Sequence, residues 1–379
     1  MKKIAALVLA LALLLSVSAF AEAPAAVTTT AQCENIAKYG NVVLDYTCED
    51  LLSAGYVYGD VVTVSFLGQE LDIPFCSNYS DVDSGSPALF ARDGDTYIVA
   101  AINMGDFATV YGIAVKTTFE DKTFVWNWAE GVEGPVQFEI SLKEAAGYLD
   151  AYEMHRLTRT NERADYADLS DEEFANFRAV KTTGMGEGKL YRSSSPVNPE
   201  IGRNTYADAA IKAAGVTVVM NLADAEEAAK AYEGFADTYY ATIKFVALNS
   251  GVDVLSSEFA AKLCEGLRFF IANPGVYMVH CTEGKDRAGY VSALLECLMG
   301  ASLEEVCDDY MITYTNYYGV KKGEARYDTI LNSNIVKTLC KAFGVETLEG
   351  ADLAACAENY LTNIGLSAEE IAALKANLQ

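Results

Sequence analysis

From about residue 57 to residue 140, apolar and polar residues alternate in the manner typical of β-strands. Val62, Val64 and Phe66 alternate with polar neighbours, and Asp93-Gly94 is a hairpin signal. Further short strands are expected at residues 71–75, 89–90, 97–99, 111–115, 124–128 and 136–140. Their even spacing predicts a small all-β domain, a sandwich or barrel. Residues 22–32 are small, apolar and Thr-rich, and are expected to form a loose leader.

Four Ser-x-x-Glu sequences predict the starts of helices, because the serine and the glutamate of a capping box satisfy each other's backbone N–H groups. The first, from Ser141 to Glu144, is expected to open a helix that ends near Leu157 and links two domains over residues 141–160. The other three begin at Ser170, Ser302 and Ser367.

From residue 161 to residue 379, strand and helix patterns alternate, which predicts an α/β domain with a parallel-rich sheet and flanking helices. Residues 216–222 are mostly apolar and rich in β-branched side chains, as a buried parallel strand should be. Residues 259–270 have the spacing of an amphipathic helix. The expected chain is therefore a small all-β domain over residues 22–140, a linking helix, and an α/β domain with a helical C-terminal extension.

The candidate chemistry lies in the stretch from Val276 to Gly289. Four residues from Val276 to Val279 predict a buried strand, a polar loop then begins at Cys281, and apolar residues at helical spacing follow Ala288. A loop ahead of a helix N-terminus turns backbone N–H groups inward and binds anions. The same environment lowers the pKa of a thiol to roughly 3.5–7.5. Arg287, at the other end of the loop, can hold two phosphate oxygens with its planar fork.

Residues 280–289 resemble the signature of the cysteine-dependent tyrosine phosphatase superfamily: histidine, cysteine, any five residues, arginine. The core from Gly284 to Arg287 resembles a bacterial branch of secreted tyrosine and phosphoinositide phosphatases, and the resemblance covers about residues 161–328. It implies a tyrosine-phosphatase-like fold and hydrolysis of phosphomonoesters, with Cys281 as nucleophile and Arg287 binding phosphate. The residues implied to bind phosphate or support the loop are His280, Thr282, Glu283, Gly284 and Lys285. No metal or organic cofactor is implied.

Residues 190–193 resemble an element that lies near the active site in the same branch, so Arg192 is a candidate substrate-binding residue. The alternative is that Arg192 only holds the fold together. Two acids compete to protonate the leaving oxygen. Asp286 lies in the loop, and Asp253 lies 28 residues before the cysteine, like the mobile-loop acid of other members. We favour Asp286, because the motif fixes its position; the alternatives are that Asp286 positions Arg287 and that Asp253 starts a helix.

One position departs from the family pattern. Serine or threonine usually follows the arginine, and its hydroxyl helps the thiolate leave phosphorus; this chain has Ala288. Slow turnover of the phosphocysteine is therefore expected, unless Thr282 or one of the serines 193–195 supplies the hydroxyl.

Within the all-β domain, the runs 79–82, Gly85 and 88–90 resemble part of the β-barrel domain attached to bacterial S-adenosylmethionine-hydrolysing enzymes. The resemblance covers one loop and its flanking strands, so it supports the fold and not that activity. We expect a packing or adhesion module, whose partner the sequence does not identify.

The N-terminus predicts export. Lys2 and Lys3 precede an apolar run that ends near Leu15, and Ala19-Phe20-Ala21 has the small-x-small form of a cleavage site. Residues 1–21 are therefore expected to be a signal peptide, and the protein to be secreted, periplasmic or on the cell surface. The run is too short to span a membrane and no second run reaches that length, so no transmembrane anchor is expected.

The formal net charge of -25 argues against nucleic acid or anionic membrane as partners. An anionic substrate must then be captured by a local positive site, and the cysteine loop is the candidate. Phosphotyrosine is the favoured substrate, with inositol phosphate or phosphoinositide as the alternative; a catalytically weak phosphate-binding or adhesion protein is a third hypothesis. Nine cysteines allow local pairs, Cys33–Cys48 and Cys340–Cys356, or a mostly reduced chain.

Overall fold

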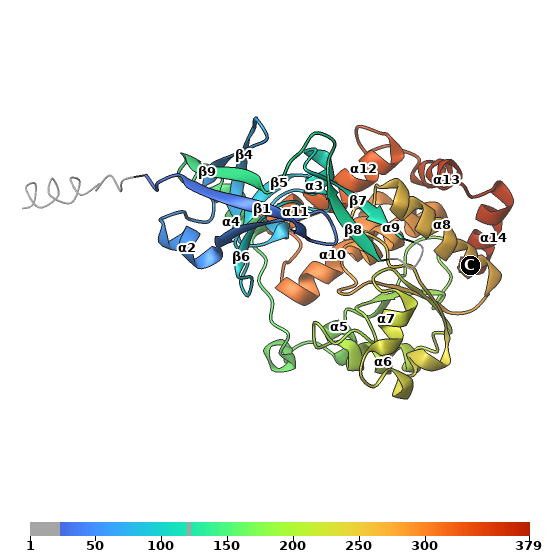
Figure 1. Cartoon of the computed structure of the whole chain (residues 1–379). Coiled ribbons are helices and arrows are strands. Elements are labelled where there is room, and N and C mark those ends of the chain that lie inside the picture. The colour runs from blue at the N-terminus through green and yellow to red at the C-terminus, as the bar shows by residue number, and fades with distance from the viewer. Residues whose placement is uncertain (1–22, 120–122) are drawn as a thin grey trace, which may run out of the picture.

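The computed structural model describes residues 23–119 and 123–379. The expected signal peptide over residues 1–21 lies outside these residues. Figure 1 shows an N-terminal β-barrel beside a larger α/β domain whose sheet is surrounded by helices. Within the described ranges, no helix is long and apolar enough to cross a membrane.

The N-terminal domain is a closed barrel with the strand order β1-β2-β6-β5-β4-β3-β9. Its strands are β1 (Val27–Ile36), β2 (Val42–Thr47), β3 (Val61–Phe66), β4 (Gln69–Cys76), β5 (Pro87–Phe90), β6 (Tyr97–Ile102) and β9 (Val136–Glu144). Val62, Val64 and Phe66 of β3 are buried while their neighbours are partly exposed, as the alternation predicted. The expected small all-β domain is thus a barrel. The short helix α2 (Cys48–Ser53) and the 3-10 turn η1 (Tyr79–Asp81) lie in its connections.

The loose leader expected over residues 22–32 is wrong from residue 27 onward, because residues 27–36 form strand β1. Val27, Thr29 and Ala31 are buried in alternation, and β1 pairs with both β2 and β9. Threonine is β-branched and fits a half-buried strand, so the Thr-rich composition favours this strand rather than a coil.

The helix expected from Ser141 is also wrong, because Ser141 and Glu144 lie in strand β9. Ser141 pairs with Thr63 of β3, and the pairing continues to Glu144 opposite Val61. Ladder hydrogen bonds along β3 occupy the backbone groups that a capping box would satisfy. The all-β domain therefore extends past residue 140, and the linking helix is the shorter α4 (Leu149–His155).

A two-stranded hairpin, β7 (Ala114–Thr118) and β8 (Phe124–Trp128), lies outside the barrel order. The strand expected at residues 111–115 begins only at Ala114, because the short helix α3 (Phe107–Val110) and a turn precede it. Asp106 caps α3 by accepting a hydrogen bond from the Thr109 N–H.

The α/β domain contains a five-stranded sheet with the order β10-β11-β14-β12-β13. Strands β11, β14, β12 and β13 pair in parallel, and β10 pairs antiparallel at one edge. The bounds are β10 (Arg178–Ala179), β11 (Leu190–Ser193), β12 (Val218–Asn221), β13 (Lys244–Ala247) and β14 (Tyr277–His280). Strand β14 lies at the centre and is fully buried, as its run of apolar residues predicted.

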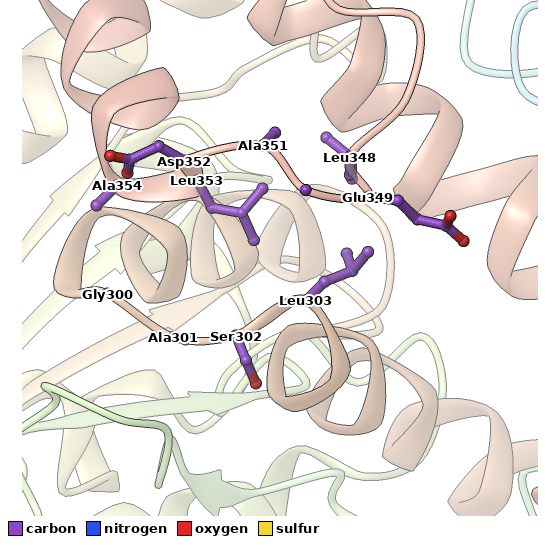
Figure 2. A pocket seen from close by; sticks show the side chains of 11 residues that line it. Gly300, Ala301, Ser302, Leu303, Leu348, Glu349, Ala351, Asp352, Leu353 and Ala354 are labelled. Carbon is purple, nitrogen blue, oxygen red and sulfur yellow. The ribbon is translucent and has the colours of Figure 1, made fainter.

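The capping boxes expected at Ser170, Ser302 and Ser367 are confirmed. The helices of this domain are α5 (Asp171–Phe174), α6 (Asn204–Ala213), α7 (Glu226–Ala231), α8 (Ser257–Ala272), α9 (Arg287–Met299), α10 (Leu303–Tyr318), α11 (Ala325–Leu331), α12 (Lys337–Phe343), α13 (Leu353–Asn363) and α14 (Ala368–Leu378). Shorter helical turns are η2 (Arg163–Tyr166), η3 (Phe235–Asp237), η4 (Tyr240–Thr242) and the π-helical η5 (Asn332–Val336). The connections that precede α10 and α13 border a pocket of about 430 Å³, shown in Figure 2.

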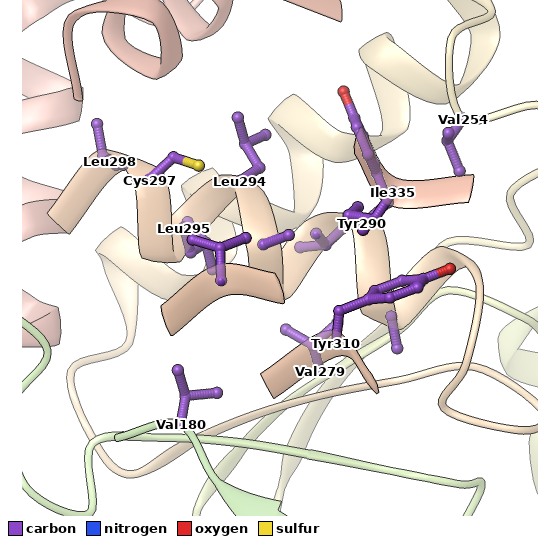
Figure 3. Close-up of a cluster of buried hydrophobic side chains, with 14 of the residues drawn as sticks. Val180, Val254, Val279, Tyr290, Leu294, Leu295, Cys297, Leu298, Tyr310 and Ile335 are labelled. Atoms are coloured by element: carbon purple, nitrogen blue, oxygen red, sulfur yellow. The ribbon is translucent and has the colours of Figure 1, made fainter. Parts of the chain in front are cut away.

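Helix α9 is the centre of the α/β core, and all of its residues are buried. Leu294, Leu295 and Tyr290 pack in one cluster with Val279 of β14 and Tyr310 of α10 (Figure 3). The helix that follows the cysteine loop is therefore rigidly held, which fixes the position of the loop. All nine cysteines, which lie in the described ranges, are free, so neither local disulfide is formed.

Candidate active site

The loop of residues 281–287, called here the cysteine loop, joins the central strand β14 to helix α9. Cys281 follows directly after β14, and Arg287 is the first residue of α9. The loop lies at the carboxyl edge of the parallel strands, the edge where sites of open α/β sheets are built. Gly284 has φ +70°, and a Cβ there would lie 2.2 Å from the Ser193 carbonyl oxygen. The loop therefore packs directly against the backbone of β11.

Arg192 of β11 lies beneath the cysteine loop and has no exposed surface. Its Nη2 donates hydrogen bonds to the carbonyl oxygens of Gly284, at 2.9 Å, and Lys285, at 3.3 Å. Its Nη1 donates to the Asp309 carboxylate of α10, at 2.9 Å. These contacts favour the interpretation that Arg192 holds the loop in the fold, rather than the expectation that it binds substrate.

Three further groups bind the outward-facing carbonyls of the loop, and the sequence analysis predicted this role for none of them. Ser195 N–H donates to the Thr282 oxygen at 3.0 Å. The Glu283 oxygen accepts from Asn176 Nδ2 at 3.2 Å and from Tyr317 Oη at 2.6 Å. Asn176 follows the end of α5 with φ +54°, a position where asparagine is favoured. That preference predicts a helix end but cannot reveal the contact with the loop.

With these carbonyls turned outward, the N–H groups on the opposite edges of the same peptide planes face the inside of the loop. These are the N–H groups of residues 283–286, and none of them donates a hydrogen bond to any residue that the structure describes. The N-terminus of the buried helix α9 adds its partial positive charge at the same point. Four N–H groups of the expected anion cradle of residues 282–287 thus face the inside of the loop.

His280 is fully buried and supports the loop from the strand side. Its Nδ1 lies 3.2 Å from the Cys281 carbonyl oxygen, and its Nε2 lies 3.2 Å from Tyr240 Oη. Burial lowers the pKa of His280 to about 4, so the imidazole is neutral at physiological pH. A neutral ring can donate from Nδ1 to Cys281 and accept from Tyr240, which orients the loop without adding charge to the thiol.

Arg287 extends across the carboxyl edge of the sheet. Its Nη1 donates to the carbonyl oxygens of Ser250, at 3.1 Å, and Leu222, at 3.3 Å, which follow β13 and β12. Nη2 and Nε of Arg287 have no hydrogen-bond partner among the described residues. One side of the fork is thus anchored, and the other can bind an oxyanion.

Lys285 and Glu283 form a charged pair on the outer side of the loop. Glu283 accepts from Arg159 at 2.6 Å and lies 3.2 Å from Lys285 Nζ, which also lies 3.3 Å from Tyr318 Oη. Burial opposes the charge of Glu283, but Lys285 and Arg159 together lower its pKa to about 2. Burial also opposes the charge of Lys285, but Asp286 and Glu283 raise its pKa well above the usual value. The positive charge of Lys285 is therefore compensated within the loop.

Asp286 and Asp253, the two candidate acids, differ in the contacts that their carboxyl groups make with the rest of the protein. Partial burial raises the pKa of both groups, which suits a proton donor. Asp253 accepts from the Leu255 N–H at 3.0 Å just before α8, as the helix-start alternative predicts. The side chain of Asp286 is 41% exposed, and its one ion pair within the described ranges is with Lys285, at 3.8 Å. The geometry therefore favours Asp286 as the acid.

The hydrogen bonds of Thr282 and of serines 193–195 show which of these hydroxyl groups are free to replace the one absent at position 288. Ser193 and Ser194 both donate to the Ala175 carbonyl, and Ser195 Oγ accepts from two backbone N–H groups. The Thr282 side chain has no hydrogen-bond partner among the residues described and is partly exposed. The Thr282 hydroxyl therefore remains a candidate, as does the Ser195 hydroxyl, whose own proton has no acceptor among the described residues.

Two cavities in the described part of the chain are lined by neither Cys281 nor Arg287. The pocket of Figure 2 is lined by residues 300–303 and 348–354, at the far end of α9 from the cysteine loop. A second cavity of about 480 Å³, between residues 158–169 and 315–319, borders the loop through Arg159 and Tyr318. Among the described residues, no group of three or more His, Cys, Asp or Glu side chains could hold a metal ion.

Comparison with known proteins gives two family matches along the chain. Residues 172–379 match the model of the tyrosine phosphatase family, and residues 35–120 match that of the SAM hydroxide adenosyltransferase C-terminal domain. No curated protein matches the chain.

Two solved structures are similar in part. The core catalytic domain of the PP-IP phosphatase SIW14 from S. cerevisiae, in complex with citrate, is 20% identical with a TM-score of 0.27, over 44% of this chain and 91% of that one. An uncharacterized conserved protein from Thermotoga maritima is 20% identical with a TM-score of 0.23, over 31% of this chain. The match spans 36% of the Thermotoga protein.

Proposed function

We propose that the chain, which belongs to the tyrosine phosphatase family, is a phosphoric monoester hydrolase that acts on phosphotyrosine through a phosphocysteine on Cys281. The observation that carries this proposal is the arrangement of the cysteine loop. Its carbonyls are bound by the scaffold, its N–H groups face inward, and Arg287 has one free side.

In the first step, the Cys281 thiolate attacks phosphorus and the bond from phosphorus to the leaving oxygen breaks. The loop N–H groups and Arg287 stabilise the charge on the phosphoryl oxygens, and Asp286 protonates the leaving oxygen. In the second step, water attacks the phosphocysteine with Asp286 as the base. The sulfur–phosphorus bond breaks, which releases phosphate and restores the thiolate.

The pairing of Lys285 with Glu283 supports phosphotyrosine over a highly charged inositol phosphate. A polyphosphate needs uncompensated positive charge beside the loop, whereas Lys285 lies 3.2 Å from a carboxylate held ionised. The phenol of tyrosine has a pKa of about 10, so it also leaves more readily than an inositol alkoxide. We further propose that the protein is exported, on the signal sequence at residues 1–21.

Turnover of a generic aryl phosphate tests the enzyme, with Cys281→Ser as the inactive control. A panel of phosphotyrosine peptide, inositol hexakisphosphate and a phosphoinositide then ranks substrates by kcat/KM. We expect the peptide to be hydrolysed fastest and the serine variant to bind phosphate without turnover. Preference for an inositol substrate would replace the proposed substrate class. Phosphate binding without turnover by the wild type would favour a phosphate-binding protein.

A further inference from the structure

The barrel contacts the phosphatase domain at the edge of the active site. Lys38 lies in the connection between β1 and β2, and its Nζ donates to Asn249 Oδ1 at 2.6 Å. Asn249 follows strand β13, at the same carboxyl edge that carries the cysteine loop.

The hairpin outside the barrel braces the Lys38 segment. Lys116 of β7 donates to the Lys38 carbonyl oxygen at 2.9 Å, and Trp126 Nε1 of β8 donates to the Ala37 oxygen at 3.2 Å. Lys116 and Trp126 are paired across the two strands, so both donors come from the same point of the hairpin. Burial lowers the pKa of Lys116. These two hydrogen bonds therefore fix the backbone of residues 37 and 38, from which the Lys38 side chain extends to the other domain.

Asn249 is the neighbour in sequence of Ser250, whose carbonyl oxygen accepts a hydrogen bond from Arg287. Asn249 has φ +46°, in the left-handed region, which asparagine adopts more readily than most residues and glycine adopts freely. The next residue, Ser250, accepts from Arg287 Nη1 through its carbonyl and donates its hydroxyl to the Leu222 oxygen, at 2.6 Å. The Leu222 oxygen is the second acceptor for Arg287. A bond that holds the Asn249 side chain therefore also helps to set the position of the neighbouring Ser250 carbonyl, which orients Arg287.

We propose that Lys38 is a positioning residue of the phosphatase: the barrel holds Asn249 and Ser250 so that Arg287 is aimed at the phosphoryl group. The inference rests on the proposed function, in which Arg287 binds the transferred phosphate. It assigns the N-terminal domain a role in the active site of its own chain, rather than an adhesive one alone.

The test replaces Lys38 by methionine, which keeps most of the side-chain length and removes the donor. We expect kcat with an aryl phosphate to fall about three- to tenfold and inhibition by inorganic phosphate to weaken by a similar factor, because a small misplacement of a catalytic group is costly. Lys38→Arg keeps a donor and should restore most of both. Lys143→Met is the matched control, since Lys143 pairs with Asp72 inside the barrel domain, 3.3 Å away, and should leave both values unchanged.

Asn249→Gly tests whether Lys38 acts through Asn249. Glycine adopts the left-handed conformation freely and removes only the side-chain acceptor. We expect it to lower kcat as Lys38→Met does, and the double variant to lose no more than either alone, because coupled residues are not additive. Thermal unfolding of each variant shows whether the fold is intact.

Wild-type values in a folded Lys38→Met variant would overturn this inference, as would independent, additive losses in the double variant. Either result leaves the proposed function standing if the wild type hydrolyses the aryl phosphate and Cys281→Ser does not. The affinity for inorganic phosphate does not depend on turnover, so it tests the Lys38 contact even if the wild type proves inactive and the proposed function fails.

Discussion

Replacing Gly284 by alanine tests whether the cysteine loop must pack against the backbone of β11. The added Cβ would lie 2.2 Å from the Ser193 carbonyl oxygen and 2.8 Å from the Ser194 nitrogen. Side-chain carbons essentially never approach such atoms within 3.0 Å. The colliding atoms are backbone, so no rotamer change relieves the contact, and the loop and β11 must separate.

The size of the effect follows from this geometry. The loop has to move by roughly 1 Å, and a misplacement of that size costs about 100-fold in rate, or about 2.7 kcal/mol of transition-state stabilisation. The φ of +70° adds about 1–2 kcal/mol of backbone strain for a residue with a Cβ, which lowers the free energy of unfolding. The displacement and the backbone strain are both confined to the loop, so the protein should still fold. Its kcat/KM should fall by about two orders of magnitude.

Gly215→Ala is the matched control, because Gly215 has φ +67° but no atom lies within 4 Å of the place that an added Cβ would take. It should lose about 1–2 kcal/mol of stability through strain alone and keep its activity. Steady-state hydrolysis of an aryl phosphate and chemical denaturation measure the two quantities in both variants. Activity of Gly284→Ala within threefold of wild type would refute the claim that the packing against β11 positions the catalytic loop.

Other variants test the individual roles. Arg287→Lys should lower kcat/KM by about 100-fold or more, because an ammonium cannot replace the bidentate fork; near-normal kcat/KM would remove it as the phosphate clamp. Wild type should show a burst of phenol before slow turnover, and Ala288→Ser should raise the steady-state rate about tenfold and the burst less; no burst and no gain would assign the hydroxyl role to another group. The pKa of Asp286 is raised, so the acid-dependent rate should decline as pH rises through that pKa, and Asp286→Asn should abolish this limb. If Asp253→Asn, and not Asp286→Asn, abolishes the decline of the rate with rising pH, Asp253 is the general acid.

The reactive loop could be predicted from sequence because its elements are local. Strand, loop and helix follow one another within residues 276–299, and each has its own apolar pattern. Cys281 and Arg287 appear at the two ends of the loop, as the motif requires. The roles of Arg192 and Lys285 could not be decided in this way. Their partners, Asp309 and Glu283, determine whether each charge is available to a substrate, and a motif does not name its partners.

The Ser-x-x-Glu sequences show where a local pattern fails. Ser170, Ser302 and Ser367 each begin a helix, whereas Ser141 lies within β9. The difference lies in strand β3, which precedes β9 by about 75 residues in the sequence and offers a full ladder of backbone partners. Pairing with a strand at that separation outweighs a capping preference of about 1 kcal/mol. A short stretch of sequence around Ser141 does not include β3, so it cannot reveal this pairing.

The pattern of ion pairs is consistent with the proposed binding of an anion by a chain of net charge -25. Around the cysteine loop, Arg192 pairs with Asp309, while Lys285 pairs with Glu283. Arg287, by contrast, makes no ion pair with any residue in the described ranges, and its nearest acceptors are two uncharged carbonyls. A compensated cation offers little to a ligand, whereas an unpaired one beside a helix N-terminus and inward N–H groups concentrates positive potential at one point. In the proposed reaction, the surrounding carboxylates therefore confine anion binding to the position from which Cys281 attacks.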